Sequence, residues 1–546
     1  MYENANFVTL IIRGELDLKI REKLSNIFTK CLYRNITIFL LILVYFNYIK
    51  IRYKNVITNS DLCNMVLEAN DIIHGNFFLN DWHLTGLTFI TTDLPYYMLS
   101  TAVFGISIRS YVYASALMFV AFIISCYLLI KDKLPENKLY IVLFFSIACI
   151  PSDFALNVMR VHTADVTLSL VGLYIISNCS SNNKTLTFSS SVLAWFFFTL
   201  AVTGDSVCIP FVIIPALCIS LINIIRNYLN NLKIDKNDII ISIIALLSIV
   251  SGKLLEKLYF VLGNANKNTF LGTRKFIALE DIYAKLALYF RSLLNLFNAD
   301  FAGTEVLSPK VVFYFLGTLV VIISLYSVIW NIWNYLKGTK YDRLALTLSL
   351  GFVLISVLCI ITNIYVDLGS TRYYATALGI LCVILIRTYS VNIKSCLSDM
   401  KSRKMTIILS LFLLVFSCHQ LLPLPANNYK KDSSLLTLIN VLKANNLSQG
   451  YSEFWTASSA TVYSNNSIKI RALIRTNNKL AQFKWFCKND WFNEESHFVV
   501  VNANGKGQFF SKNEVEQALG KPDKVISSAP YLIYVYGKDI SKEIVR

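Results

Sequence analysis

The chain has 546 residues, of which 55% are hydrophobic and 16% are charged, and its mean hydropathy is +0.53. Soluble domains carry about 25% charged residues, so this composition excludes an ordinary soluble protein and indicates a polytopic protein embedded in a lipid bilayer. The net charge of +17 does not indicate a nucleic-acid partner. Lysine and arginine gather in the cytoplasmic loops of membrane proteins, and the chain has no basic module with interleaved aromatic residues.

The N-terminal segment, residues 1–35, is polar and basic, so the positive-inside rule places it in the cytoplasm. The first span is predicted over Cys31–Ile49, without the cleavage site of a removable signal peptide. The loop 50–107 should then lie outside the cell. Its apolar stretch Leu94–Gly105 has about half of the ~20 residues that a crossing needs, so we expect a helix on the outer surface. A short true span there would invert every later loop.

Ten more spans are expected before residue 425, which makes about eleven in the membrane region 36–425. They are Ile108–Ile130, Leu139–Leu156, Asp165–Ser177, Leu186–Thr203, Val207–Ile225, Ile239–Ser251, Val311–Ile332, Leu344–Ile364, Ala375–Thr388 and Met405–Leu422. This assignment places the basic clusters on one side, as the charge bias requires. The clusters are 131–138, 226–236, 337–343 and 394–404. The outer segment Gly252–Lys310 carries an amphipathic stretch, Ile282–Phe297.

Residues 427–546 are more polar than the rest of the chain. The runs 497–503 and 531–537 alternate between apolar and polar residues, which predicts strands, and 512–521 predicts a helix that ends near Gly520. We therefore expect a small α/β domain of about 110 residues outside the membrane, following an all-α polytopic bundle.

Acidic residues stand at several loop edges on the predicted outer side. They are Asp61, Asp71, Asp93, Asp153, Asp165, Asp205 and Asp367. Acids gathered on one side suggest a shared wet cavity, although any one of them can equally be a solvated loop residue or a helix cap. Asp61 follows Ser60 and fits the N-cap or the first turn of a helix over 61–73.

Two isolated arginines, Arg160 and Arg372, lie in the short outer loops. Arginine suits a phosphate at the membrane interface because of its permanent charge and its several N–H donors. A salt bridge to a nearby aspartate, or snorkelling to the headgroups, would explain them equally well. His162 lies beside Arg160, but its HTAD context is not a metal motif.

Several common motifs are missing from the sequence. There is no P-loop, no GxGxxG after a strand and no GxSxG, so a nucleotide-driven pump is not expected. The twelve cysteines form no CxxC pair and no Cys/His cluster, so neither disulfides nor a metal site is predicted. Aromatic residues near the outer loops, such as Trp82, belong to an interfacial belt or stack on a sugar.

One span is followed by an outer loop that opens with an acid at a helix start. An Ala-x5-Gly spacing comes next (Ala69 to Gly75), and then a Pro-Tyr-Tyr helix that ends in Phe-Gly (Pro95 to Gly105). This order resembles the GT-C superfamily of membrane glycosyltransferases, and most closely its branch of protein O-mannosyltransferases and bacterial aminoarabinose transferases. The family's first-loop Asp-Glu pair is matched at Asp61, whereas Leu62 stands in place of the glutamate.

Further short stretches are similar to uncharacterised bacterial members of this superfamily. They are Gly-Asp-Ser-Val at 204–207, the region around His162, Arg372-Tyr373 and GYSEFW at 450–455. The family's Pro-Pro-Leu segment is matched only loosely, at 93–96.

The resemblance implies that a sugar moves from a polyprenyl-phosphate donor to a glycan, lipid or protein acceptor on the outer face of a bacterial inner membrane. An inverting transfer needs a carboxylate that deprotonates the acceptor hydroxyl, for which Asp61 is the first candidate and Asp71 the second. Arg372, with Arg160 and His162, would stabilise the leaving phosphate. The cavity or the sugar would be contacted by Asp93, Asp205, Trp82, His83 and Tyr373.

The absence of glutamate at position 62 leaves the division of roles among the acids open, and a divalent cation is neither required nor excluded. The main alternative function is a transporter or flippase of a lipid-linked sugar, and a third is a non-catalytic envelope assembly protein. A transporter should carry polar or broken helices near the middle of the membrane. The predicted spans are mostly uninterrupted and their charges gather at one rim, which favours one-sided chemistry.

Overall fold

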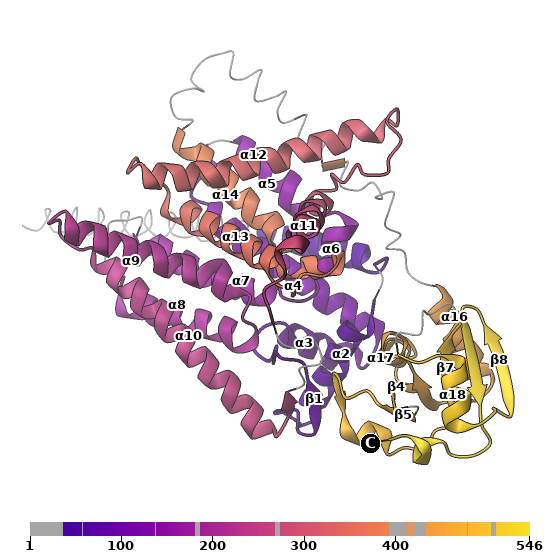
Figure 1. Ribbon diagram of the computed structural model, residues 1–546. Helices are drawn as coiled ribbons and strands as arrows, with labels where there is room; N and C mark the ends of the chain where they lie inside the picture. Colours follow the sequence, from indigo (N-terminus) through magenta and orange to yellow (C-terminus); the bar gives the residue numbers. More distant parts are fainter. Residues whose placement is uncertain are drawn as a thin grey trace, which may run out of the picture. The chain divides into compact units, whose positions relative to one another are not determined.

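The computed structural model describes most of the chain, namely residues 36–56, 58–136, 138–180, 186–267, 274–392, 411, 415, 417–418, 433–477, 479–503 and 509–545. The predicted cytoplasmic segment 1–35, the basic cluster 394–404 and most of the predicted span Met405–Leu422 lie outside the described residues. Helices dominate the described chain, and strands gather in its C-terminal region (Figure 1).

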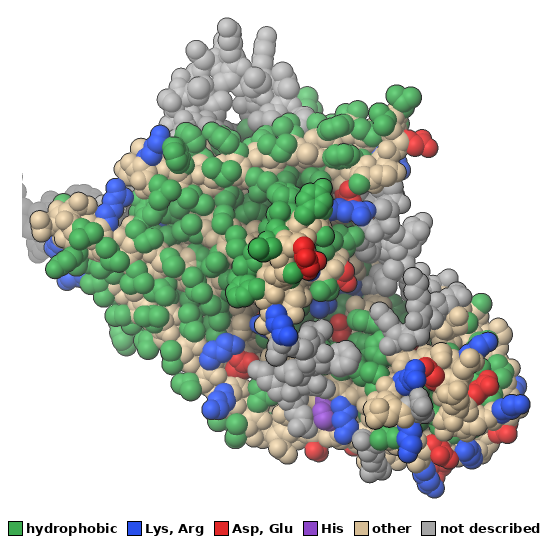
Figure 2. Space-filling view, viewed as in Figure 1, with side chains coloured by type: hydrophobic (Ala, Val, Ile, Leu, Met, Phe, Trp, Pro, Cys, Tyr) green, Lys and Arg blue, Asp and Glu red, His purple; other side chains and the backbone are tan. Residues whose placement is uncertain are grey.

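Six helical segments of the described chain are long and apolar enough to cross a membrane. They are Ile36–Tyr53, Ile108–Ile130, Ile209–Leu229, Lys236–Gly263, Lys310–Leu336 and Arg343–Ile361. Apolar side chains cover the helical part in Figure 2, whereas charged side chains gather on the C-terminal region. Exposed apolar surface of this extent belongs in lipid, so the chain is a multi-pass membrane protein. Four other predicted spans coincide with shorter apolar helices, Leu139–Cys149, Ala164–Asn178, Phe188–Gly204 and Ala377–Ser390.

The helix Ile36–Tyr53 is apolar along its length. Phe39, Leu41 and Val44 are each more than half exposed, as expected for side chains that face lipid rather than a protein core.

The longer helices after this first one are labelled in Figure 1. In chain order they are α2 (Ser60–Ile73), α3 (Leu94–Phe104), α4 (Ile108–Ile130), α5 (Lys138–Phe144), α6 (Asp153–Val158), α7 (Ala164–Ser180), α8 (Phe188–Gly204), α9 (Ile214–Leu229), α10 (Lys236–Gly263), α11 (Ile282–Leu296), α12 (Lys310–Leu336), α13 (Arg343–Ile361) and α14 (Ala377–Asn392). Short helical turns stand between them, namely η1 (Leu134–Glu136), η2 (Phe145–Cys149), η3 (Ile209–Ile213), η4 (Leu279–Asp281) and η5 (Leu368–Tyr373).

Two predicted spans have different limits in the structure. The predicted span Leu139–Leu156 ends at Cys149, because Pro151 interrupts the chain and Ser152 caps the separate helix α6. The predicted span Ile239–Ser251 continues as α10 to Gly263. Its added turns contain charged residues, and Lys253 is paired to Glu256 at 2.6 Å. An ion pair at this spacing supports a helix rather than ending it.

The C-terminal region contains a mixed six-stranded sheet in the order β5-β4-β3-β7-β9-β8. Its strands are β3 (Gln449–Ser452), β4 (Lys469–Thr476), β5 (Lys479–Gln482), β7 (Phe498–Asn502), β8 (Lys524–Ser528) and β9 (Tyr531–Val535). Strands β4, β3 and β7 are parallel to one another, and the outer strands pair antiparallel. The helices are α16 (Ser433–Ala444), α17 (Phe454–Tyr463) and α18 (Lys512–Leu519).

Both faces of this sheet are covered, because successive side chains of a strand point to opposite faces. In β7, Phe498 and Val500 pack in the core formed with α16 and α17, whereas Val499 and Val501 pack in the core formed with α18. The alternating runs therefore became β7 and β9, and the predicted helix 512–521 became α18.

A second, small sheet joins three distant parts of the chain. Its order is β2-β1-β6, with β1 (Trp82–Leu84), β2 (Asn266–Lys267) and β6 (Cys487–Lys488). Helix α17 also packs on α2, where the backbone N–H of Ser459 donates to Ser60 Oγ at 3.3 Å. The segment 59–107, which carries α2 and β1, is thus a part of the helical region that contacts the C-terminal region.

Candidate active site

The N-terminal turn of α2 carries the first candidate residue. The Asn59 side chain caps the helix by accepting a hydrogen bond from the Leu62 backbone N–H at 3.2 Å. Asp61 therefore lies in the first turn and is not the cap. A carboxylate is favoured there by the partial positive charge of the helix N-terminus.

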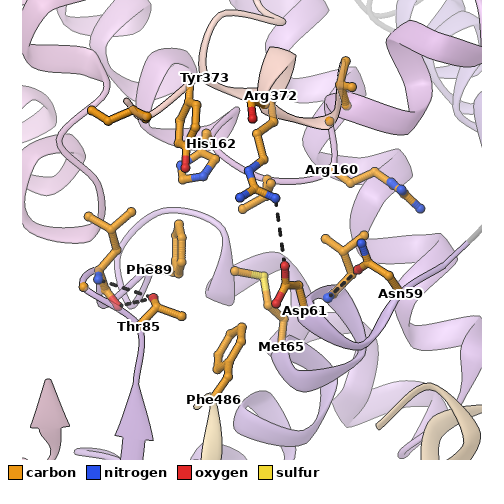
Figure 3. A pocket seen from close by; sticks show the side chains of 18 of the residues that line it. Asn59, Asp61, Met65, Thr85, Phe89, Arg160, His162, Arg372, Tyr373 and Phe486 are labelled. Atoms are coloured by element: carbon orange, nitrogen blue, oxygen red, sulfur yellow. Dashed lines mark hydrogen bonds and ion pairs between the residues drawn. The ribbon is translucent and has the colours of Figure 1, made fainter. Parts of the chain in front are cut away.

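A cavity of about 400 Å³ opens beside Asp61 (Figure 3). This volume lies in the ordinary range of small-molecule sites. Asp61 is the only acid among the described residues that line the cavity, whereas Arg160, Arg274 and Arg372 all contribute to its walls. The excess of arginine makes the cavity suited to an anionic ligand.

Asp61 and Arg372 face each other across this cavity (Figure 3), with Asp61 Oδ2 and Arg372 Nη1 3.9 Å apart. The separation is too long for a hydrogen bond. The side chains are 27% and 33% exposed, respectively, and the buried Nε of Arg372 has no hydrogen-bond partner among the described residues. Because both side chains are partly exposed, both present charged atoms to a ligand that enters between them.

Arg372 lies near the end of η5, whose start is fixed by a capping box between Asp367 and Ser370. Asp367 Oδ1 accepts a hydrogen bond from the Ser370 backbone N–H at 2.8 Å. The acid nearest to Arg372 in sequence thus has a capping role, and Arg372 is left to face Asp61.

Burial raises the pKa of Asp61 above the usual value of an aspartate, and the neighbouring Arg372, a hydrogen bond from Trp485 and the nearby His162 oppose this rise. A raised pKa lies closer to neutral pH, where a general base most readily takes up and releases a proton. The direction of this shift agrees with a role in proton transfer.

His162 is held from two sides by buried aspartates. Its ring Nδ1 is hydrogen-bonded to Asp205 Oδ2, and its backbone N–H donates to Asp93 Oδ2 at 3.0 Å. The Ala164 backbone N–H donates to the other oxygen of Asp93 at 3.1 Å. Asp93 and Asp205 were predicted to contact the cavity or the sugar; the structure places them behind His162, which itself lines the cavity.

Burial raises the pKa of Asp93 to about 6, although the nearby His162 and the two backbone N–H donors favour its ionised form. A carboxylate with two backbone donors is a strong anchor for a loop. The position of His162 is therefore set by buried hydrogen bonds rather than by solvent.

Aromatic rings form one wall of the cavity. The ring centroid of His162 is 5.5 Å from that of Phe89 and 4.9 Å from that of Tyr373. The guanidinium carbon of Arg372 lies 5.3 Å from the centre of the Tyr373 ring, within the range of a cation–π contact. These contacts give Arg372 and His162 a common, stiff support.

Three lining residues have a left-handed backbone, namely Phe89, His162 and Phe486, with φ values of 50°, 57° and 53°. Most other non-glycine residues with positive φ in the described chain are asparagines, which tolerate this conformation well. Phenylalanine does not, and such strain concentrates at binding and catalytic sites. Gly204 supports the strained Phe89 by accepting its backbone N–H at 3.0 Å. A Cβ at position 204 would come within 2.4 Å of the Thr92 hydroxyl.

Arg160 lines the cavity, but its guanidinium group points away from the Asp61–Arg372 pair in Figure 3. Its Nε donates to the Asn157 carbonyl at 2.7 Å, and its Nη1 donates to the Tyr111 hydroxyl. These bonds suit a residue that shapes the cavity wall, and they leave Arg372 as the predicted phosphate ligand that faces Asp61 directly.

Three predicted site residues, Asp71, Trp82 and His83, are not among the described residues that line the cavity. Trp82 Nε1 donates to Asp71 Oδ2 at 2.9 Å, and the same oxygen is 3.3 Å from Lys488 Nζ. His83 Nε2 is 2.8 Å from Asn489 Oδ1. All three residues connect the segment 59–107 to the C-terminal region.

Several lining residues were not predicted from the sequence, namely Asn59, Arg274, Asn363, Trp485 and Phe486. Arg274 and Asn363 come together because the segment after residue 273 runs beside the end of α13, where the Asn363 backbone N–H donates to the Lys275 carbonyl at 3.0 Å. The adjacent aromatic pair Trp485-Phe486 in a polar region was the one available signal.

In the part of the chain that the structure describes, no group of three or more His, Cys, Asp and Glu side chains is arranged to hold a metal ion. Comparisons with protein-family models and with curated proteins find no match for this chain. The chemistry of the site is therefore argued from its residues and geometry.

Proposed function

We propose that this chain is an integral membrane glycosyltransferase that moves a sugar from a polyprenyl-phosphate donor to a hydroxyl-bearing acceptor. The observation that carries the proposal is the Asp61–Arg372 pair, 3.9 Å apart in a cavity of about 400 Å³. A base and a fixed cation in one cavity are the two groups that transfer from a phosphate-linked sugar needs.

Asp61 would accept the proton of the acceptor hydroxyl while that oxygen attacks the anomeric carbon. The bond between this carbon and the phosphate oxygen breaks in the same step, and its electron pair leaves with the polyprenyl phosphate. Arg372 would stabilise the negative charge that develops on the phosphate. Binding of the two substrates would replace the direct pairing, with the hydroxyl at Asp61 and the phosphate at Arg372.

His162 would act as a further polar contact to the donor. Because Nδ1 is bonded to the buried Asp205, the other ring nitrogen, Nε2, is the one left for a ligand. Asp205 would also hold the ring beside Tyr373. A sugar hydroxyl, which both donates and accepts hydrogen bonds, would fit this nitrogen in either protonation state.

The sidedness of the site belongs to the same proposal, as do the eleven spans and a location in a bacterial inner membrane. Helix α4 runs from the capping residue Ser107, just after α3, to the basic cluster that begins at Lys131. Its 23 residues have a length of about 35 Å at 1.5 Å per residue, enough to separate the two ends across the hydrocarbon core. The basic end would be cytoplasmic, and the cavity and the C-terminal region would face outward.

We expect cysteines introduced at Lys131 and Asn513 to be labelled from opposite sides of the membrane. Both positions are exposed. In intact cells an impermeant maleimide should label Asn513→Cys, whereas Lys131→Cys should react only after the membrane is opened. The exposed Cys218 and Cys418 would first be replaced by serine. Labelling of both variants in intact cells would contradict the proposed orientation.

The proposed reaction is tested with the purified chain in lipid nanodiscs and a panel of undecaprenyl-phosphate sugars. Mass spectrometry would follow the release of undecaprenyl phosphate, a product that forms whichever acceptor, including water, takes the sugar. We expect release with at least one donor, above the background of protein-free nanodiscs. If no donor is consumed but a labelled donor crosses the bilayer of proteoliposomes, the chain is a transporter.

A further inference from the structure

The C-terminal region reaches the cavity through the short segment between β5 and β6. Trp485 and Phe486, in this segment, line the same cavity as Asp61, and a side-chain hydrogen bond from Trp485 is among the influences that lower the pKa of Asp61. In Figure 3, Phe486 lies on the other side of Asp61 from Arg372. Asp61 is therefore contacted from the C-terminal region on one side and from η5 on the other.

The conformation of this segment is fixed from within. The Phe483 backbone N–H donates to the Ala472 carbonyl at 3.0 Å, and the Trp485 backbone N–H donates to the Phe483 carbonyl at 2.8 Å. Phe486 is buried with φ at 53°. A bulky residue keeps this conformation only where its surroundings hold it, so the segment presents Trp485 in one defined orientation.

The segment is also fixed from outside, by the first outer loop. Strand β6 pairs antiparallel with β1, so that Trp82 lies opposite Lys488. The Asn489 backbone N–H donates to the Asp81 carbonyl at 3.0 Å. The ring of Trp82 meets that of Trp491 edge-on, with centroids 5.0 Å apart. These contacts connect the loop that carries Asp61 with the segment that carries Trp485.

We propose that Trp485 is a positioning residue for Asp61, so that the C-terminal region completes the site formed by the membrane helices. The inference rests on the proposed function, in which Asp61 is the base. The indole N–H of tryptophan can donate a hydrogen bond, but the indole cannot act as the base that takes up the proton of the substrate hydroxyl. Trp485 would therefore act by fixing the orientation of the carboxylate and by favouring its ionised form.

The first test needs neither donor nor acceptor. Dicyclohexylcarbodiimide modifies protonated carboxyl groups in apolar surroundings, so its reaction with Asp61 reports the protonation of that residue. In the purified full-length protein, fragment mass spectrometry would give the extent of modification at Asp61 between pH 5 and pH 9. Replacing Trp485 by phenylalanine should move the half-modification point upward by about one pH unit, the size expected for one lost hydrogen bond to a charged group.

Three controls separate positioning from a general loss of structure. Glu68 lies on the same helix and is buried, with its own raised pKa that burial and Asp71 explain, so its modification should not change. The exposed Trp455 offers a matched variant, Trp455→Phe, which should leave the Asp61 profile unaltered. Trp485→Gln keeps an N–H donor, so its half-modification point should move upward less than that of Trp485→Phe.

An unchanged Asp61 profile in a Trp485→Phe protein that leaves Glu68 unaffected would overturn the inference. If that variant does not fold, Lys488→Met offers a second test. It weakens the contact between the first loop and the C-terminal region without changing a cavity residue, and it should shift the Asp61 profile in the same direction. Lack of a shift in the folded Lys488→Met protein would then count against the inference.

A second measurement connects the inference to turnover. With a donor that the wild-type protein consumes, Trp485→Phe should lower kcat about tenfold and leave the KM for the donor within about twofold, because the lost interaction is to the base and not to the phosphate. If no donor is consumed by the wild-type protein, the proposed function fails, whereas carbodiimide modification still shows whether Trp485 controls Asp61.

Discussion

Replacement of Asp61 by asparagine should lower the rate of sugar transfer by about 10²–10⁴-fold, the usual contribution of a general base. Asparagine has nearly the same shape as aspartate, and the helix cap at Asn59 does not depend on residue 61. Expression, membrane insertion and the thermal unfolding midpoint should therefore stay close to those of the wild-type protein. The rate would be measured as release of undecaprenyl phosphate from a donor that the wild-type protein consumes.

The pH dependence of the wild-type rate should report the ionisation of Asp61. In its proposed role Asp61 acts only as a carboxylate, so activity should be lost when the pH falls through its pKa. Since burial raises that pKa, the loss should begin at a higher pH than an ordinary aspartate would give. The loss of activity at low pH should be absent from the residual activity of Asp61→Asn. If the loss persists unchanged, it belongs to another residue.

Two other aspartates of the same loop are suitable controls. Asp81 is exposed and has a left-handed backbone that asparagine also adopts readily, so Asp81→Asn should retain full activity. Asp71 was the second candidate for the base, but it bonds to Trp82 and lies 3.3 Å from Lys488. Asp71→Asn should keep most of the activity. If it loses as much as Asp61→Asn does, the assignment of the base is wrong.

Replacement of Arg372 by glutamine should reduce kcat/KM for the lipid-linked donor by about 10²–10³-fold, as expected when a preorganised donor to a developing anion is removed. Arg372→Lys should recover part of the activity, because lysine keeps the charge but not the planar fork of donors. Both rates would be measured with the donor panel under conditions that also give the KM of the wild-type protein.

Arg109 provides the matched control for this substitution. It is exposed, near the start of α4, and does not line the cavity, so Arg109→Gln should leave kcat/KM within about twofold of wild type. Binding of undecaprenyl phosphate alone should weaken in Arg372→Gln and stay unchanged in Asp61→Asn. Equal binding by Arg372→Gln and the wild-type protein would remove Arg372 from the phosphate site.

The periodic parts of the fold could be predicted from the sequence. The alternating run 497–503 gave β7, the amphipathic stretch Ile282–Phe297 gave α11, and the short apolar stretch Leu94–Gly105 gave α3. In each case one local pattern decides both the type and the length of the element. Helix α10 continues past its predicted limit at Ser251, because the charged residues of its later turns interrupt the apolar run without ending the helix.

The candidate site could be predicted only in part. Asp61, Arg160, His162, Arg372 and Tyr373 do line one cavity, although they come from loops far apart in the sequence. The roles of Asp93, Asp205 and Trp82 could not be deduced, because they depend on which backbone N–H, ring or lysine faces each side chain after folding. An acid at a loop edge looks the same in a sequence whether it faces substrate or supports a histidine.

The pairing of β1 with β6 also has a consequence for the order in which the protein matures. His83 meets Asn489 across 406 positions of the chain, and the walls of the cavity extend from Asn59 to Phe486. A ribosome has therefore made nearly the whole polypeptide before the last wall can close. Helices inserted earlier hold Asp61 and Arg372 without Trp485, so under the proposed function competence for transfer would arise only at the end of biogenesis.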